Sequence, residues 1–369
     1  MKERGFMEEF KNNEFVEMEA QTVTEKVSQA SDPAEAKANY SKFGFGYLGA
    51  AILNVVAAVV ILLIASATGT GIENNVTFRF AVSIATLYFI GLPFAYFVVN
   101  KIPNCEIGNK KMSFGQIISS LLIGYALIIG SNIVGTMINS FFGQLTGKGI
   151  QNPIAGVMSG LNPIFNICVV AILAPTMEEL VFRKLLVDKL YKYGEGLTIL
   201  FSGLMFGLFH GNFAQFFYAF ALGVYFAYIY MRTGRIRYTI YIHMFINGIG
   251  AFASIIVSKL DIEYIQELLF SGRVEEYMAY VTENMAAVGL LALYGFIVLC
   301  VSFVGLILMI VFHKKFHIDT IATALPKGTG AKSLFGNPGM IGFILFFVVS
   351  IVLAQFGSSI SAVLMGLFG

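Results

Sequence analysis

The chain has 369 residues, of which 57% are apolar and 12% are charged, and its mean hydropathy is +0.77. This composition excludes an ordinary soluble domain, in which about 25% of the residues are charged. The net charge of +2, from 24 basic and 22 acidic residues, is too small to indicate a nucleic-acid partner. The sequence therefore predicts an integral membrane protein.

A polar segment opens the chain, and apolar runs fill the rest. Residues 1–42 carry many charges of both signs and lack the pattern of a secretory signal, so we expect a polar cytosolic tail. Residues 43–369 are expected to form a transmembrane bundle with the candidate catalytic motifs in 160–260. Nine apolar runs have about the length needed to span a bilayer. They are 43–68, 81–100, 114–142, 164–188, 197–212, 213–231, 238–258, 286–312 and 339–367.

The nine runs indicate an all-α, polytopic transmembrane bundle. In lipid every backbone polar group needs a partner, which a helix supplies from within itself, whereas barrel strands would alternate apolar and polar residues. The fifth and sixth runs form one apolar stretch, which we divide at Gly211. Each half is short, so a tilted or re-entrant helix is an alternative.

The distribution of basic residues predicts the orientation of the bundle. With the amino terminus inside, cytosolic segments hold twenty Lys and Arg residues and the opposite side holds four, as the positive-inside rule requires. The largest external segment, 259–285, is acidic, and an amphipathic helix there is one interpretation. Short loops and this charge layout indicate a multi-pass protein of a bacterial plasma membrane with a cytosolic amino terminus.

Placing an ionisable side chain inside an apolar run costs free energy in the bilayer, so such residues indicate function. Apart from charged residues near the basic end of the fourth run, they are confined to the fourth, fifth and seventh runs. Asn247 is added to them because it shares a helix face with a histidine. The candidate site residues are therefore Glu178, Glu179, Arg183, His210, His243 and Asn247.

Helical geometry predicts different roles for the two adjacent glutamates. Glu179 and Arg183 are four residues apart and share a face, so the spacing predicts an ion pair with a structural role. Glu178 lies about 100° around the helix and stays available to a reactant. Pro175, just before them, can open the local hydrogen-bond ladder and admit water.

The same four-residue spacing recurs in two other runs, where Phe206 precedes His210 and His243 precedes Asn247. If these side chains converge with Glu178, the carboxylate can take a proton from water that an imidazole positions, and His243 with Asn247 can donate hydrogen bonds to an oxyanion. This set predicts hydrolysis of an amide bond without a covalent intermediate or a required cofactor.

Other uses of the same residues stay open. Glu178, His210 and His243 could instead hold a zinc ion with water in the fourth position, and the two histidines could bind haem. A non-catalytic scaffold protein or a transporter could also carry these side chains, although the sequence has no convincing inverted repeat.

The three motifs carry a resemblance to a known family. Glu-Glu-x-x-x-Arg at 178–183, Phe-x-x-x-His at 206–210 and His-x-x-x-Asn at 243–247 resemble the signature motifs of the CAAX protease and bacteriocin-processing family, also called Abi proteins. This family is related to the type II CAAX prenyl endopeptidases. The resemblance covers about 160–260, while the polar tail, the ninth run and segment 259–285 depart from it.

The resemblance implies an eight-helix-type core and an intramembrane peptidase that acts on a membrane-associated peptide or protein. It implies that the residues matching Glu178 and His210 activate water, and that those matching His243 and Asn247 hold the oxyanion. Some relatives are described as metalloproteases, more of them as glutamate-dependent enzymes. Non-catalytic bacteriocin immunity is the alternative function within the family.

Depth in the membrane is a point of conflict in this prediction. At about 1.5 Å per residue, Glu178 and His243 lie roughly 8–15 Å from the cytosolic boundary, whereas His210 falls near the far end of its run. The fifth helix must therefore be strongly tilted, or its predicted boundary must be wrong.

Overall fold

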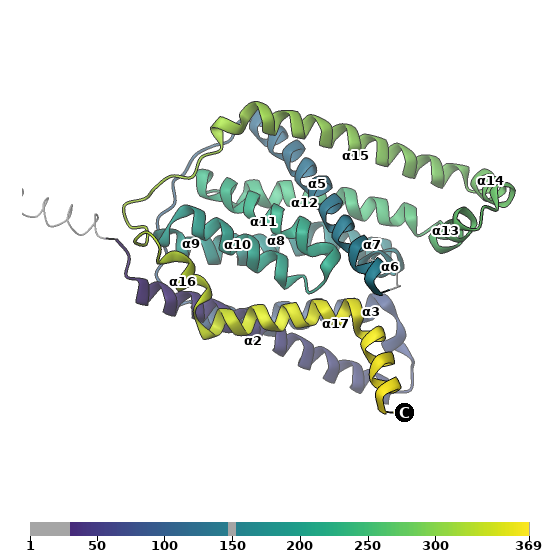
Figure 1. Ribbon diagram of the computed structural model, residues 1–369, viewed down its shortest axis with the longest axis horizontal. Helices are drawn as coiled ribbons and strands as arrows, with labels where there is room; N and C mark the ends of the chain where they lie inside the picture. Colours follow the sequence, from purple (N-terminus) through teal and green to yellow (C-terminus); the bar gives the residue numbers. More distant parts are fainter. Residues whose placement is uncertain (1–29, 147–152, 369) are drawn as a thin grey trace, which may run out of the picture.

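The computed structural model describes residues 30–146 and 153–368. Within these ranges the regular elements are helices and no strand is present, which confirms the predicted all-α class. Seven helical segments in the described part are long and apolar enough to cross a membrane, and two shorter apolar helices, Glu195–Phe209 and Pro338–Ala354, fall on the fifth and ninth predicted runs. The chain is a multi-pass membrane protein built as a helical bundle (Figure 1).

One layer of the bundle combines the two ends of the described chain. Helix α2 (Pro33–Ala67) starts before the predicted run, because the Asp32 side chain caps it by accepting a hydrogen bond from the Ala34 backbone. The predicted tail boundary at 42 thus falls inside α2, and residues 1–29 of the expected tail lie outside the described residues. Helix α17 (Pro338–Phe368) packs along α2 (Figure 1).

The second and third predicted runs form the next helices. The second run is a continuous segment of three parts that packs on α2, and the third is a single long helix. These elements are α3 (Val76–Thr86), the π-helical segment η2 (Leu87–Gly91), α4 (Leu92–Val99) and α5 (Phe114–Thr146).

The fourth run is a helix of changing pitch. After α6 (Pro153–Gly160), it alternates α-helical with π-helical parts and ends in a short turn of 3₁₀ helix. In chain order the parts are α7 (Pro163–Asn166), η3 (Ile167–Leu173), α8 (Ala174–Glu179), η4 (Leu180–Leu185), α9 (Leu186–Leu190) and η5 (Tyr191–Tyr193).

Helices α10 (Glu195–Phe209) and α11 (Phe213–Thr233) form an antiparallel pair at the centre of the bundle (Figure 1). Gly211 has a φ of 64°, a left-handed conformation that glycine adopts without steric cost. The side chain of Asn212 then caps α11 by accepting from the Gln215 backbone at 2.9 Å. The predicted division at Gly211 is therefore confirmed.

The remaining elements complete the bundle and its two ends. Helix α12 (Ile236–Val257) packs on η3 and α8, and α15 (Met285–Phe312) crosses α5. A linker from the 3₁₀ segment η6 (His313–Lys315) through α16 (Gly330–Phe335) leads to α17. The acidic external segment forms two helices, α13 (Ile262–Phe270) and α14 (Val274–Glu283).

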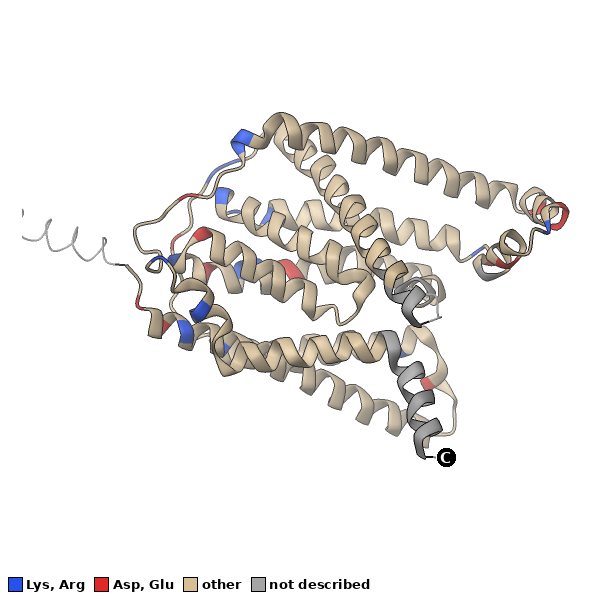
Figure 2. Ribbon diagram, in the orientation of Figure 1, with Lys and Arg blue, Asp and Glu red and all other residues tan. Residues whose placement is uncertain are grey.

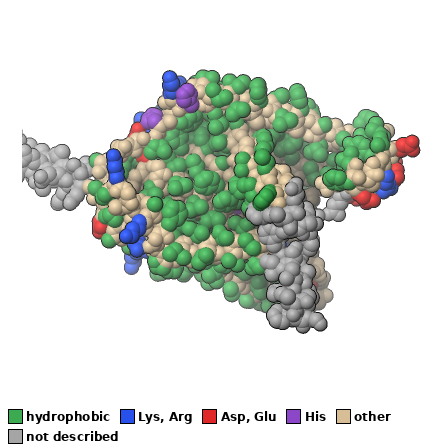
Figure 3. Space-filling view, in the orientation of Figure 1, with side chains coloured by type: hydrophobic (Ala, Val, Ile, Leu, Met, Phe, Trp, Pro, Cys, Tyr) green, Lys and Arg blue, Asp and Glu red, His purple; other side chains and the backbone are tan. Residues whose placement is uncertain are grey.

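Charges gather at the two ends of the bundle, and the middle is apolar. Most of the Lys and Arg side chains of the described part lie at the end from which α2 starts, and the acidic α13–α14 hairpin projects from the opposite end (Figure 2). Apolar side chains cover the face between these ends (Figure 3). Large apolar side chains such as Phe89 and Phe296 are exposed on the described part of the chain. This pattern fits a bundle whose central belt contacts lipid.

Candidate active site

The short helix α8 carries the first motif between two π-helical segments. Pro175 in its first turn has no N–H to donate to the preceding turn, and η3 ends immediately before α8 while η4 begins immediately after it. π-Helical turns often occur at functional sites because they widen the helix and rotate side chains. Segment η4 is fixed from two sides, since Tyr47 donates to the Val181 carbonyl at 2.9 Å and Ser202 donates to that of Phe182 at 2.8 Å.

The predicted ion pair in the first motif is present and completely buried. Arg183 Nη1 lies 3.3 Å from Glu179 Oε1, and neither side chain is exposed. Two rings cover the guanidinium, with its Cζ 4.4 Å from the centroid of Phe206 and 5.5 Å from that of Phe226. Cation–π attraction is strongest where water is excluded, so these rings help to hold the charge inside the bundle.

His243 bridges the two adjacent glutamates. Its Nδ1 donates to Glu179 Oε1 at 3.0 Å, and its Nε2 lies 3.6 Å from Glu178 Oε2. The imidazole is almost fully buried, with rings of Phe206 at 5.9 Å and Phe226 at 5.3 Å. Because Glu179 and these rings fix the imidazole, Nε2 is directed to Glu178.

Glu178 is the more accessible of the two carboxylates. Its side chain is 26% exposed, whereas that of Glu179 is 0% exposed. Tyr88 and Tyr218 lie close enough to feel its charge, and Gln215 Nε2 donates to Tyr218 Oη at 2.8 Å. Glu178 therefore has one edge toward His243 and another toward a half-buried polar region that a reactant can enter.

His210 lies at the carboxyl end of α10, one turn after Phe206. Its Nδ1 is 2.8 Å from the Phe206 carbonyl, and since a carbonyl oxygen can only accept, Nδ1 carries the proton and Nε2 has the lone pair. The Phe206 ring contacts both imidazoles edge-on, with centroids 4.8 Å from His210 and 5.9 Å from His243. In the described part of the chain no hydrogen bond joins His210 to Glu178.

The conflict over membrane depth comes from the predicted end of the fifth helix. Helix α10 has 15 residues, about 22 Å at 1.5 Å per residue, which is shorter than a full span. It ends at Phe209, inside the bundle, where the Phe206 side chain meets His243 of α12. His210 therefore lies at the level of the other motifs because its helix stops early.

Asn247 follows His243 by one turn of α12 and points to the same side of that helix. Its Nδ2 donates to the Val170 carbonyl in η3 at 3.1 Å. An amide nitrogen has two hydrogens, so Asn247 keeps a second donor while this bond fixes its side chain. Its contact with η3 connects the third motif to the π-helical segment that precedes the first.

The donors expected for zinc do not gather into a metal site. Across the residues that the structure describes, no three His, Cys, Asp or Glu side chains lie close enough together to hold a metal ion. Glu178 and His243 are close to each other, and Nδ1 of His210 contacts a backbone carbonyl, which leaves Nε2 as the nitrogen that could face a ligand. Glu178, His210 and His243 are thus not gathered into a three-residue cluster in the described part of the chain, and the zinc-dependent alternative stays a prediction.

Two neighbours of the site were not predicted from the sequence. Phe226 covers both Arg183 and His243, and Tyr218 approaches Glu178. Both lie on α11, whose apolar part has no Asp, Glu, Lys, Arg or His. Hydrophobicity and charge therefore could not identify them as neighbours of the site. A weak signal was Gly223 between them, whose hydrogen atoms allow α10 and α11 to touch.

Comparison with known proteins agrees with the three motifs. Residues 160–249 match the family described as type II CAAX prenyl endopeptidase Rce1-like. The chain is 33% identical over 141 residues to the membrane-embedded CAAX protease MroQ of Staphylococcus aureus and 29% identical over 157 residues to the putative membrane peptidase YdiL of Bacillus subtilis.

These matches cover 36% and 41% of this chain, and 56% and 62% of the lengths of the two relatives. No solved structure matches the chain. The family match runs from the last residue of α6 to the middle of α12, so it contains all three motifs. The segment 160–249 is therefore similar to the Rce1-like family of type II CAAX prenyl endopeptidases, in agreement with the motifs.

Proposed function

We propose that the chain is a membrane-embedded endopeptidase that hydrolyses a peptide bond of a membrane-associated peptide or protein. The observation that carries this proposal is the unequal environment of the two adjacent glutamates. Glu179 is fully buried and bonded to Arg183 and His243, whereas Glu178 is partly exposed and faces His243 Nε2 at 3.6 Å. The names of the two relatives, a CAAX protease and a putative membrane peptidase, support the same activity.

In the proposed reaction Glu178 acts as the general base. It takes a proton from a water molecule while the water oxygen attacks the peptide carbonyl carbon, which gives a tetrahedral intermediate with a negative oxygen. Glu178 then gives the proton to the leaving nitrogen as the carbon–nitrogen bond breaks. The products are one carboxylate and one amine, and no covalent enzyme intermediate forms.

The two histidines and Asn247 have supporting roles. His210 accepts a hydrogen bond from the attacking water at Nε2, the nitrogen left with a lone pair by the bond to the Phe206 carbonyl. The second amide hydrogen of Asn247 donates to the negative oxygen, and the His243 imidazole, held by Glu179, donates beside it. Donors held in place before the reaction stabilise such charge strongly, because no reorganisation is needed.

The test compares wild type with Glu178→Gln, which preserves size and removes the base. Both are expressed at matched abundance, and peptides in membranes and medium are quantified by mass spectrometry. Peptides specific to the wild type should disappear with Glu178→Gln, a loss of at least about 100-fold for a general base. Glu275→Gln, at an exposed glutamate of α14, is the matched control and should keep them.

Equal peptide profiles for wild type and Glu178→Gln would refute the peptidase proposal. A cellular phenotype that also survives the substitution would support a non-catalytic immunity or scaffold protein instead. The new termini of any specific peptides would identify both the substrate and the cleaved bond.

A further inference from the structure

A cavity lies beside the α10–α11 pair. It has a volume of about 590 Å³, within the range of sites that bind small molecules. Its walls come from α5, α10, α11, α15 and the start of the linker after α15, and they are almost entirely apolar. Representative wall residues are Leu127, Ile199, Phe220, Val224, Met309 and Ile318.

Helix α11 separates this cavity from the candidate active site. Val224 lines the cavity, and Phe226 covers Arg183 and His243. Two residues apart on a helix are about 200° apart around its axis, so the two side chains point in nearly opposite directions. The cavity is therefore a site of its own, and the inference drawn from it does not depend on the proposed peptidase activity.

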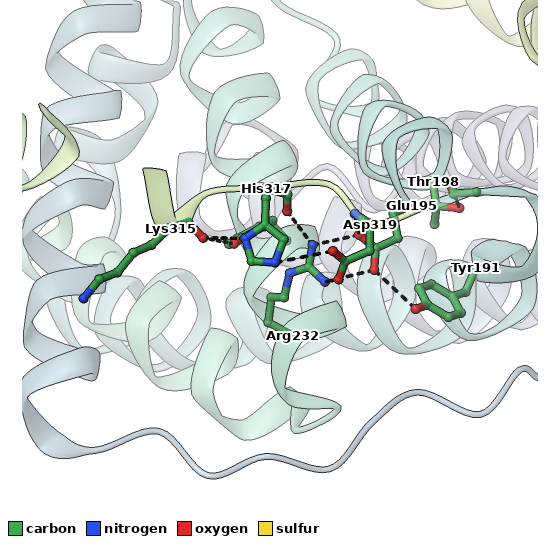
Figure 4. A network of polar contacts seen from close by, with 9 residues as sticks. Tyr191, Glu195, Thr198, Arg232, Lys315, His317 and Asp319 are labelled. Carbon is green, nitrogen blue, oxygen red and sulfur yellow. Dashed lines mark hydrogen bonds and ion pairs between the residues drawn. The ribbon is translucent and has the colours of Figure 1, made fainter. Parts of the chain in front are cut away.

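A polar network fixes the linker that closes one side of the cavity (Figure 4). Arg232 pairs with Glu195 at 2.7 Å and with Asp319 at 2.6 Å, and it also donates to the His317 carbonyl. The Asp319 backbone donates to Glu195 at 2.7 Å. Since Glu195 is buried, these bonds anchor the linker firmly to α10 and α11.

The rim of the cavity is basic. His313 and His317 line it, and Lys314 and Lys315 lie between them in the sequence, with both lysines exposed. Imidazole and basic side chains lie together on the surface at the end of α15 (Figure 3). The acidic neighbour Asp319 pairs with Arg232 and also lies 3.4 Å from His317 Nε2, so the lysines are the cations left for a headgroup.

We propose that this cavity binds an anionic phospholipid from the leaflet at the basic end of the bundle. One acyl chain fills the apolar cavity, and the phosphate lies outside its mouth against the exposed Lys314 and Lys315. Charge complementarity supports a lipid of this kind, because basic pockets between transmembrane helices on the positive side attract anionic headgroups. An apolar chain joined to a negative group matches an apolar cavity with a positive mouth.

The test uses full-length protein purified in mild detergent and exposed to equal amounts of phosphatidylglycerol and phosphatidylcholine, with bound lipid measured by native mass spectrometry. Wild type should retain phosphatidylglycerol at least several-fold over phosphatidylcholine. Ala221→Phe, at a wall residue, should fill the cavity and lower bound phosphatidylglycerol several-fold. Ala292→Phe, at an exposed site of α15, adds the same ring elsewhere and should not.

The headgroup contact is tested separately at the two exposed lysines. Lys314→Gln combined with Lys315→Gln should abolish the preference for phosphatidylglycerol. The control, Lys327→Gln with Lys332→Gln at the same end of the bundle, should keep it. The proposal is overturned if wild type shows no preference, if Ala221→Phe binds as much lipid as wild type, or if the lysine pair variant keeps the wild-type ratio.

Discussion

Two neighbouring glutamates on one helix have opposite environments in this protein. Glu179 is enclosed by Arg183, His243 and the surrounding rings, and Glu178 is the exposed partner of the same imidazole. The hydroxyl of Thr239, one turn before His243, also lies next to the Glu179 carboxylate. The pair thus combines a fully enclosed carboxylate with a partly exposed one.

This division predicts different outcomes for the same substitution at adjacent positions. Glu179→Gln leaves the Arg183 charge buried without its counter-charge, and breaking a buried ion pair costs about 3–5 kcal/mol. We therefore expect a clearly lower temperature of unfolding for Glu179→Gln in detergent, while Glu178→Gln unfolds close to wild type. Equal unfolding temperatures for the two variants would contradict the assignment of Glu179 as the structural residue.

At the scale of elements, the close contact of α10 with α11 positions the site. Phe206 on the first helix and Phe226 on the second cover Arg183 from two directions. The helices approach this closely because Gly203 faces α11, where a Cβ would lie 2.5 Å from Val224 and 3.0 Å from the Phe220 carbonyl. Small residues at such contacts let backbones approach and gain dispersion energy in lipid.

Gly203→Ala should therefore push the two helices apart. Overpacking of this kind costs about 1–3 kcal/mol, and the displaced Phe206 would loosen both imidazoles, so we expect lower thermal stability together with reduced peptide release. Gly295→Ala is the matched control, because a Cβ at Gly295 of α15 meets nothing within 4 Å. If both variants unfold at the wild-type temperature, the close contact is unimportant for stability.

At the scale of the whole molecule, the separation of charge implies an orientation. Basic side chains gather at one end of the described bundle and the acidic hairpin α13–α14 lies at the other (Figure 2). By the positive-inside rule, the basic end from which α2 starts is the end expected to face the cytosol. We propose this orientation, in a bacterial plasma membrane, for the chain.

Site-directed labelling tests the orientation. In a background lacking Cys105, Cys168 and Cys300, a membrane-impermeant maleimide should label Ser271→Cys, in the exposed turn between α13 and α14, on intact cells. Lys327→Cys, in the exposed linker after α15, should be labelled only after the cells are permeabilised. The reverse pattern would show that the bundle has the opposite orientation.

The sequence by itself determined the environment of the chain, its helical class and the residues of the three motifs. Apolar runs and four-residue spacings are local properties, and a helix in lipid satisfies its own backbone whatever its neighbours are. For this reason the division at Gly211 and the Glu179–Arg183 pair were predictable. The first motif also predicted that the side chains of Glu178 and Glu179 point in different directions, since adjacent residues on a helix lie about 100° apart around its axis.

Tertiary structure decided which helix faces meet and how deep each side chain lies. The contacts of His243 with both glutamates, the cover by Phe226 and the early end of α10 at His210 depend on the rotation and offset of separate helices. The cavity beside α11 likewise needs several helices and the linker anchored by Arg232. Packing between segments far apart in the chain fixes these features, and hydrophobic runs and local spacings contain no information about that packing.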